Sequence, residues 1–350
     1  MPEKITWLAL DPVDTLTFRG AEAMVAGESH EAISLFPPLP STFVGAVRTA
    51  LLRQKKINPH DYLADPEKYA ELYPLLGVPE KPGFKLLGPI FRLQGEVFLP
   101  APGHWFREKN DKLEEALSLR LQAAQPLSDT CRGFGLLGSV ENPFWVQNPM
   151  ATDLEPLHGY WVSAAGFVLA EKSSGRFSLD LLTAPETMVA GKAALIHCRN
   201  LYDSEERFGI ALEKCTRRVK EGHLFASQHI RLKPGVQLLI GVVAPTANDF
   251  ADQGILQLGG EQRVCGYCKV NHLTLPENKN SNLVMTLSPI PVTALAEEFF
   301  ERSWAGGKLL RVGGWDMQKG FHKDMVTYYP AGTVFQGSKN LVLPTGFIRL

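Results

Sequence analysis

The segment from residue 224 to 243 constrains the fold more than any other part of this chain. It begins with a strand-like stretch, turns at Pro234 and Gly235, and continues as an apolar run over residues 236–243. A tight turn between two such runs is typical of antiparallel strands. Residues 208–212 are also strand-like. We therefore predict an antiparallel meander in the second half of the chain.

Further strands and helices are predicted along the chain without a regular alternation of the two. Strands or strand-and-turn regions are predicted at residues 5–10, 84–102, 160–170, 263–273 and 283–287. Helices are predicted at residues 41–53, 110–121, 249–256 and 292–304. A proline-stiffened entry and a Ser/Thr cap mark the first helix, and Asn110 and Asp111 with Glu114 would cap the second. This pattern predicts an α+β fold.

The chain has 350 residues, which is more than one hydrophobic core usually organises, so we expect two domains, residues 1–185 and 186–350. The formal net charge of -1 excludes a globally polycationic nucleic-acid binder. Five cysteines suggest no disulfide framework. The sequence shows neither a signal peptide nor an apolar run that could cross a membrane. We expect a cytoplasmic protein without a membrane partner.

Few sequence motifs point to catalysis or to a metal. Cys265 and Cys268 have the spacing of half a zinc site, which His223, His272 or Cys215 would have to complete. The alternative, which we favour, is that both cysteines are small apolar side chains of a strand. Motifs typical of metalloproteases, serine hydrolases and P-loop NTPases are absent. We predict no catalytic residue, no metal and no cofactor, with His30 as the one candidate general base.

A local basic stretch offers a different chemistry. Residues 214–233 contain six lysines and arginines against one acid, Glu221. A hairpin with this surplus can neutralise several phosphates although the whole chain is nearly neutral. The alternative is a solvated hairpin face without a ligand. The candidate residues for RNA binding here are Arg217, Arg218, His223, Arg231 and Lys233.

Glycine pairs and one helix start offer backbone amides to an anion. Pairs at 259–260, 306–307 and 313–314 let the backbone approach a ligand closely, and each is followed by Arg, Lys or Trp. Ser41 and Thr42 begin the first predicted helix, with Arg48 nearly two turns further on. Plain turns and a plain helix cap are the alternatives.

Four motifs together resemble one family. They are residues 10–20 (LDPVDTLTFRG), the proline-led helix 36–48 (FPPLPSTFVGAVR), the hairpin residues 207–225 with the loop 258–263, and the glycine-rich segments 313–316 and 330–335. They are similar to the RAMP proteins of CRISPR effector complexes, and specifically to the family of the third subunit of the type III-B (Cmr) complex. The equivalent type III-A subunits share the architecture and are the nearest alternative.

The resemblance implies an α+β fold of tandem ferredoxin-like (RAMP/RRM-like) domains with long inserted loops and β-hairpins. It also implies a non-catalytic subunit that recognises the 5′ tag of the CRISPR RNA, holds the large polymerase/cyclase-like subunit and adjoins a RAMP backbone subunit. A RAMP endoribonuclease acting on precursor CRISPR RNA and a protein scaffold without RNA contact are the alternatives. The expected RNA-binding residues are Arg19, Ser41, Thr42, Gly45, Arg48, Arg217, Arg218, His223, Arg231, Lys233, Gly259, Gly260, Arg263, Gly313, Gly314 and Trp315.

Overall fold

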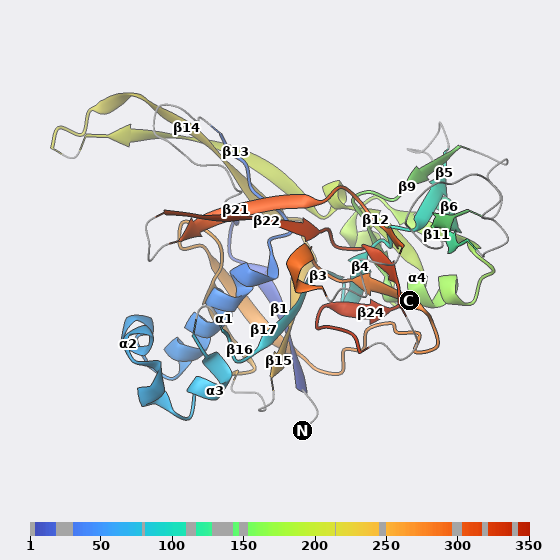
Figure 1. Cartoon of the computed structure of the whole chain (residues 1–350). Coiled ribbons are helices and arrows are strands. Elements are labelled where there is room, and N and C mark those ends of the chain that lie inside the picture. The colour runs from blue at the N-terminus through green and yellow to red at the C-terminus, as the bar shows by residue number, and fades with distance from the viewer. Residues whose placement is uncertain are drawn as a thin grey trace.

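The computed structural model describes residues 4–18, 31–78, 81–109, 117–127, 143–146, 153–213, 215–244, 250–295, 303–316, 321–337 and 342–350. Only the backbone is described for residues 31–32, 220–224, 315–316 and 322. Within these ranges the fold is α+β and consists mostly of strands (Figure 1). None of the described helices has the length and apolar character needed to cross a membrane.

Among the described residues, a 12-stranded sheet forms the body of the molecule. All its neighbouring strands are antiparallel except β11 and β12. The strands follow one another across the sheet in the order β16 (Gln253–Gln257), β17 (Val264–Val270), β1 (Lys4–Pro12), β15 (Val236–Ala244), β3 (Lys85–Leu93), β4 (Glu96–Pro100), β10 (Tyr160–Ser163), β12 (Ala194–His197), β11 (Arg176–Leu182), β6 (Ser118–Ala123), β5 (Trp105–Glu108) and β9 (Leu154–Pro156).

The centre of this sheet is buried on both faces, which explains the apolar runs of the sequence. The consecutive residues Leu238, Leu239 and Ile240 of β15 point alternately to the two faces of the sheet, and each is at most 1% exposed. Continuous apolar runs are typical of strands covered on both sides. The strands predicted at residues 5–10, 84–102, 236–243 and 263–273 are confirmed.

Four α-helices are described, and the longest, α1 (Pro40–Gln54), packs against β3 and β16. The predicted helix at residues 41–53 is thus confirmed, and its face with Phe43, Val47 and Leu51 is buried in the main core. The others are α2 (Pro59–Ala64), α3 (Tyr73–Leu76) and α4 (Ala164–Glu171), with 3-10 turns η1 (Pro66–Tyr69), η4 (Pro185–Thr187), η5 (Cys198–Asn200) and η6 (Val292–Ala294).

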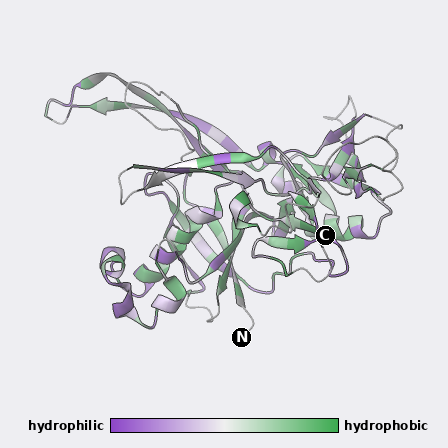
Figure 2. Ribbon diagram, in the orientation of Figure 1, coloured by the Kyte–Doolittle hydropathy of each residue, from purple (hydrophilic) through white to green (hydrophobic). Residues whose placement is uncertain are grey.

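A long hairpin of β13 (Tyr202–Leu212) and β14 (Val219–Leu232) projects from the body (Figure 1). The short strand β2 (Glu31–Ala32) joins it. Figure 2 shows hydrophobic stretches along this hairpin, far from the core, and Phe208 is 72% exposed. The strands predicted at 208–212 and 224–232 are confirmed, but the meander is wrong. After the turn at Pro234 the chain enters the large sheet, where β15 pairs with β1 and β3 and not with β14.

The C-terminal part forms smaller sheets beside the large one. The ribbon of β21 (Leu310–Asp316) and β22 (Phe321–Tyr329), joined by β19 (Ile290–Pro291), crosses the start of α1 in Figure 1. The four-stranded sheet has the order β20 (Trp304–Ala305), β23 (Val334–Gln336), β18 (Leu283–Thr286), β24 (Phe347–Arg349), so the predicted strand at 283–287 is confirmed. The strands β7 (Gln125–Pro126) and β8 (Phe144–Trp145) pair separately.

Two predicted helices are wrong where they are described. Residues 118–123 form strand β6, in which Leu119 and Leu121 are buried while Ser118 and Arg120 are exposed. This alternation has the period of a strand, and residues 110–116 lie outside the described residues. Residues 253–257 form the edge strand β16, in which Leu256 is buried and Ile255 is exposed.

Two other regions differ partly from the prediction. In residues 160–170, only 160–163 are a strand, because Ser163 then caps α4 by accepting a hydrogen bond from the amide of Gly166 at 3.3 Å. In residues 292–304, η6 and β20 occupy the two ends and residues 296–302 lie outside the described residues.

The large sheet combines strands from both predicted domains. Strand β1 lies between β15 and β17, which both come from the second half of the chain, and β12 pairs with β10 and β11 from the first half. This pairing gives no support to a division at residue 185, which stays a prediction. The tandem ferredoxin-like arrangement also stays a prediction.

Candidate nucleic-acid interface

A cleft between the start of α1 and the β21–β22 ribbon brings together two sites that are far apart in the sequence. Its volume is about 290 Å³. Ser41 and Thr42 lie on one wall, and Gly313 and Gly314 lie on the other. The remaining lining residues are Phe18, Leu35, Pro38, Leu39, Val312, Lys323, Asp324, Val326 and Tyr328. This cleft (the α1 cleft) is the part of the predicted RNA site that the fold assembles.

The α1 wall of the cleft presents a helix start that no side chain caps. Leu39 is the N-cap residue, Pro40 follows it, and the first turn contains no acid. The predicted Ser/Thr cap is therefore wrong, because Ser41 and Thr42 lie inside the first turn. Pro40 has no amide hydrogen, and the amide of Thr42 donates to the carbonyl of Leu39 at 3.0 Å, so this start offers an anion the amide of Ser41 and the positive end of the helix dipole. Gly45 is exposed one turn later, with open space at its Cα.

The opposite wall is the irregular part of the β21–β22 ribbon. The strand register shifts between Val312 and Gly314, and a Cβ on Gly314 would lie 3.7 Å from Cδ of Lys323. Lys323 is exposed, lines the cleft and supplies a cation that the sequence analysis missed. Asp324 lies beside it, so the cleft carries little net charge. Trp315 is described only by its backbone, which pairs with residue 322.

The glycine pair 259–260 packs against the segment that leads into the α1 cleft. The amide of Gly260 donates to the carbonyl of Thr17 at 2.8 Å. Gly259 has a φ of +81°, and a Cβ there would lie 2.4 Å from that carbonyl oxygen. Only glycine fits this conformation without strain. The expected role of these glycines as an RNA clamp is thus not favoured, since they position the neighbouring Phe18.

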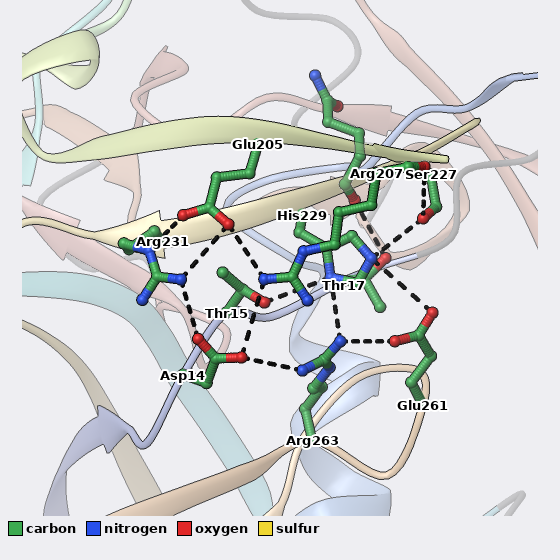
Figure 3. A network of polar contacts seen from close by, with 11 residues as sticks. Asp14, Thr15, Thr17, Glu205, Arg207, Ser227, His229, Arg231, Glu261 and Arg263 are labelled. Atoms are coloured by element: carbon green, nitrogen blue, oxygen red, sulfur yellow. Dashed lines mark hydrogen bonds and ion pairs between the residues drawn. The ribbon is translucent and has the colours of Figure 1, made fainter. Parts of the chain in front are cut away.

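Charged residues at the base of the hairpin form a balanced network (Figure 3). Asp14 accepts hydrogen bonds from Arg231 at 2.9 Å and from Arg263 at 3.1 Å, and Arg207 lies 3.8 Å away. Glu205 binds Arg207 and Arg231, and Glu261 binds Arg263 at 2.7 Å. We call these residues, with His229, the Asp14 network: Asp14, Glu205, Arg207, His229, Arg231, Glu261 and Arg263. Its three carboxylates match its three guanidinium groups.

The pKa directions within the Asp14 network agree with this pairing. The hydrogen bond from Arg231 is the largest cause that lowers the pKa of Asp14 and of Glu205, while Glu205 raises the pKa of Arg231. Burial lowers the pKa of His229, which is 1% exposed and keeps its ring within 3.1 Å of the Ser227 hydroxyl. The ion pairs therefore persist around neutral pH and join the hairpin to the loops after β1 and β16.

Acids of this chain pair with cations of the predicted basic hairpin and of the loop after β16. Arg231 and Arg263 are paired within the Asp14 network, and Lys233 lies 3.4 Å from Asp203. Among the described side chains of the hairpin, the expected basic character is kept at the tip, where Arg217 and Arg218 are exposed. The side chain of His223 and the whole of Arg19 lie outside the described residues.

Arg48 points into the protein and not toward the α1 cleft. It is 7% exposed, and its guanidinium donates to the carbonyls of Leu76 at 3.2 Å and Val78 at 2.9 Å. A cation at these carbonyls holds the C-terminal end of α3. The expected phosphate contact is therefore corrected to a structural role, because a buried guanidinium bonded to two carbonyls is not accessible to RNA.

The cysteine pair does not form half of a metal site. Cys265 and Cys268 are three positions apart on β17, so their side chains point to opposite faces of the sheet. Cys265 is buried, which raises its pKa to about 12, whereas Cys268 is exposed. No group of three or more metal-ligating side chains is found in the described part of the chain. His30 lies outside it.

Comparisons with known proteins show the family to which this chain belongs. The family model of the CRISPR-associated protein Cas_Cmr3 matches residues 8–336. The chain is also 27% identical over 143 residues to the CRISPR system CMR subunit Cmr3 of Saccharolobus solfataricus. That match covers 39% of this chain and 45% of the relative, so it spans less than half the length of either protein.

Two solved structures have the same fold. One is a chain of the type III-B Cmr-beta complex bound to cognate target RNA and AMPPnP, with a TM-score of 0.50 and 20% identity. The other is a chain of that complex bound to cognate target RNA, with a TM-score of 0.50 and 19% identity. In both cases the alignment covers 94% of this chain and 86% of the other. The family model, which matches residues 8–336, shows that the protein is CRISPR-associated. It belongs to the Cas_Cmr3 family.

Proposed function

We propose that this chain is a non-catalytic RNA-binding subunit of a type III-B CRISPR effector complex. In this role it recognises the 5′ tag of the CRISPR RNA, docks the large polymerase/cyclase-like subunit and adjoins a RAMP backbone subunit. Membership of the Cas_Cmr3 family supports the assignment to the complex. The relatives whose names mention the Cmr complex and its target RNA support it too. The single observation that carries tag recognition is the α1 cleft.

The α1 cleft has the chemistry that single-stranded RNA requires. Its uncapped helix start offers the amide and hydroxyl of Ser41 to a phosphate, and Lys323 adds one cation from the opposite wall. Tyr328 is partly exposed, lines the same space and provides aromatic surface for a base. A splayed single strand is recognised by a few such contacts and does not require a large basic surface. A near-neutral chain is therefore compatible with tag binding.

The pairing of charges limits how much of the binding is electrostatic. Arg231, Arg263 and Lys233 already neutralise acids of this chain. Among the described side chains, the exposed cations that we assign to the proposed RNA path are Lys323 in the α1 cleft and Arg217 and Arg218 at the hairpin tip. Each phosphate contact on single-stranded RNA contributes about 0.7 to the slope of log affinity against log salt. We expect a slope of roughly 2.

The test is the affinity of the purified protein for an RNA that carries the 5′ tag, measured over a series of salt concentrations. Lys323→Ala should weaken binding and lower the slope by about 0.7. Lys68→Ala, an exposed lysine on η1, is the matched control and should leave both unchanged. Equal affinities and slopes for the two variants would exclude Lys323 as a phosphate contact. Incubation with a repeat-containing RNA tests the non-catalytic role, since cleavage would favour an endoribonuclease.

A further inference from the structure

A second cavity, of about 280 Å³, shares no lining residue with the α1 cleft. Residues of β5, β6, α4 and β11 form one side, and residues 276–283 with β24 form the other. Figure 1 places α4 at the end of the molecule opposite the free end of the β13–β14 hairpin. We call it the α4 cavity. Its position leaves it free to serve a different partner from the RNA.

One wall of the α4 cavity is aromatic and contains an unpartnered polar atom. Trp105 packs against Phe177 with ring centroids 4.7 Å apart and against Phe167 at 5.4 Å. His104 adjoins Trp105 at 6.2 Å and is only 3% exposed, and its Nδ1 is buried without a hydrogen-bond partner among the described residues. Buried polar atoms in native proteins almost always have partners. This wall therefore combines aromatic side chains with one polar atom that has no partner in the described part of the chain.

The helix beside the cavity is more apolar than a surface helix should be. All residues of α4 except Glu171 are non-polar, yet Val168 and Leu169 are 42% and 39% exposed. Helices that are apolar all round are normally buried. Val168 also lines the cavity, so the exposed apolar surface continues into it. A protein partner would bury this surface, whereas a small solute would leave it in water.

The charges at the α4 cavity favour a cation. Its charged lining residues are Glu171, Glu277 and Arg349. The two glutamates are exposed, whereas Arg349 is 7% exposed and donates to the carbonyl of Ser281 at 3.2 Å. Exposed carboxylates would repel RNA phosphates and attract a lysine or arginine. The volume of about 280 Å³ lies at the lower limit of small-molecule sites, which usually have about 300–1,000 Å³, so charge and apolar surface indicate the occupant better than size does.

We propose that the α4 cavity is a socket for a long basic side chain of a neighbouring protein subunit. The methylene stem of a lysine or arginine packs on Phe177, the partly exposed ring of the aromatic wall, and its charged end pairs with Glu171 and Glu277. The residues that flank this basic side chain on the partner cover Val168 and Leu169. The inference rests on the proposed assembly into a multisubunit complex and names a surface for it.

The test is a charge reversal at the mouth of the α4 cavity in the full-length chain. Glu171→Lys with Glu277→Lys should weaken binding to one purified neighbouring subunit of the complex at least tenfold. The matched control reverses two exposed glutamates elsewhere, Glu67→Lys with Glu186→Lys, and should bind that subunit as the wild type does. The neutral pair Glu171→Gln with Glu277→Gln should give an intermediate loss, and circular dichroism checks that each variant is folded.

Tag-RNA affinity measured on the same preparations separates this inference from the proposed function. The socket is supported when the charge-reversed variant has a lower affinity for the subunit and an unchanged affinity for tag RNA. It is overturned when every subunit binds the reversed variant as tightly as the control, or when RNA affinity changes and subunit affinity does not. A wild-type chain that binds tag RNA but no subunit overturns the socket and leaves RNA recognition standing.

Discussion

Replacing His104 by phenylalanine should remove an acid sensitivity that burial builds into this fold. His104 is 3% exposed, and burial lowers its pKa from 6.5 to about 3. In the unfolded chain His104 binds a proton below pH 6.5, whereas in the folded protein its ring stays neutral down to about pH 3. The stability that the protein has with a neutral His104 is therefore complete above pH 6.5 and is lost progressively as the pH falls from 6.5 toward 3. Between pH 7.5 and 5 the loss is about 2 kcal/mol, at about 1.4 kcal/mol per pH unit below 6.5.

Phenylalanine is the suitable replacement because it keeps the ring contacts with Trp105 and Phe144, and the Nδ1 that it removes has no partner to lose. The assay is urea unfolding at pH 7.5 and at pH 5. The wild type should lose about 2 kcal/mol more than His104→Phe between the two values. The exposed His60→Gln should behave as the wild type does. Equal losses for wild type and His104→Phe would refute the argument, because the folded ring would then accept the proton.

Three further predictions concern glycines, Arg48 and the cysteines. Gly259→Ala should lower the free energy of unfolding by about 1–3 kcal/mol. Gly45→Ala, on an open helix surface, should raise it by up to about 1 kcal/mol. Urea unfolding measures both changes, and equal effects would contradict the strain at Gly259. Arg48→Ala should lower the free energy of unfolding by about 2–3 kcal/mol because its hydrogen bonds to the carbonyls of Leu76 and Val78 are lost. The slope of log affinity for tag RNA against log salt should stay unchanged. A lower slope would show that Arg48 contacts a phosphate. At pH 8, iodoacetamide should label Cys268 and should not label Cys265 until the protein unfolds, because burial raises the pKa of Cys265 to about 12. Mass spectrometry identifies the labelled peptides. Equal labelling of the two cysteines would argue against the burial of Cys265.

Local patterns in the sequence were sufficient to predict the helix and the strand that lie at the centre of the core. The proline-led helix at residues 41–53 and the apolar strand at 236–243 carry their signals within the segment itself, and both are present. The helix predicted at 110–121 relied on leucines four residues apart. Over residues 118–121 the fold obeys the alternation of Leu119 and Leu121, which face the core from β6. A short segment with two possible periods is decided by its tertiary neighbours.

Long-range charge pairing is what the sequence could not reveal. The basic count of residues 214–233 ignores Glu205 on the opposite strand of the hairpin and Asp14, which lies more than 200 positions away in the chain. Both acids pair with Arg231, and Asp14 also pairs with Arg263. The approach of Gly313 to Ser41 is equally non-local, since the β21–β22 ribbon and α1 are separated by most of the sequence.

The Asp14 network also fixes the position of the β13–β14 hairpin relative to the α1 cleft. Ion pairs that are already complete give little additional binding energy to a phosphate, because the phosphate must first displace a carboxylate. What these pairs do supply is position. Arg231 and Arg263 reach Asp14 from the hairpin and from the loop after β16, and that loop also binds Thr17 next to Phe18. The hairpin base and the Phe18 wall of the α1 cleft are therefore fixed to each other through Asp14. Asp14→Asn should weaken tag binding by loosening this arrangement, although Asp14 is itself an acid that repels phosphate. Affinity for tag RNA measures the effect, and tighter binding by Asp14→Asn would show that the carboxylate acts on the RNA through its charge and not through the position of the hairpin.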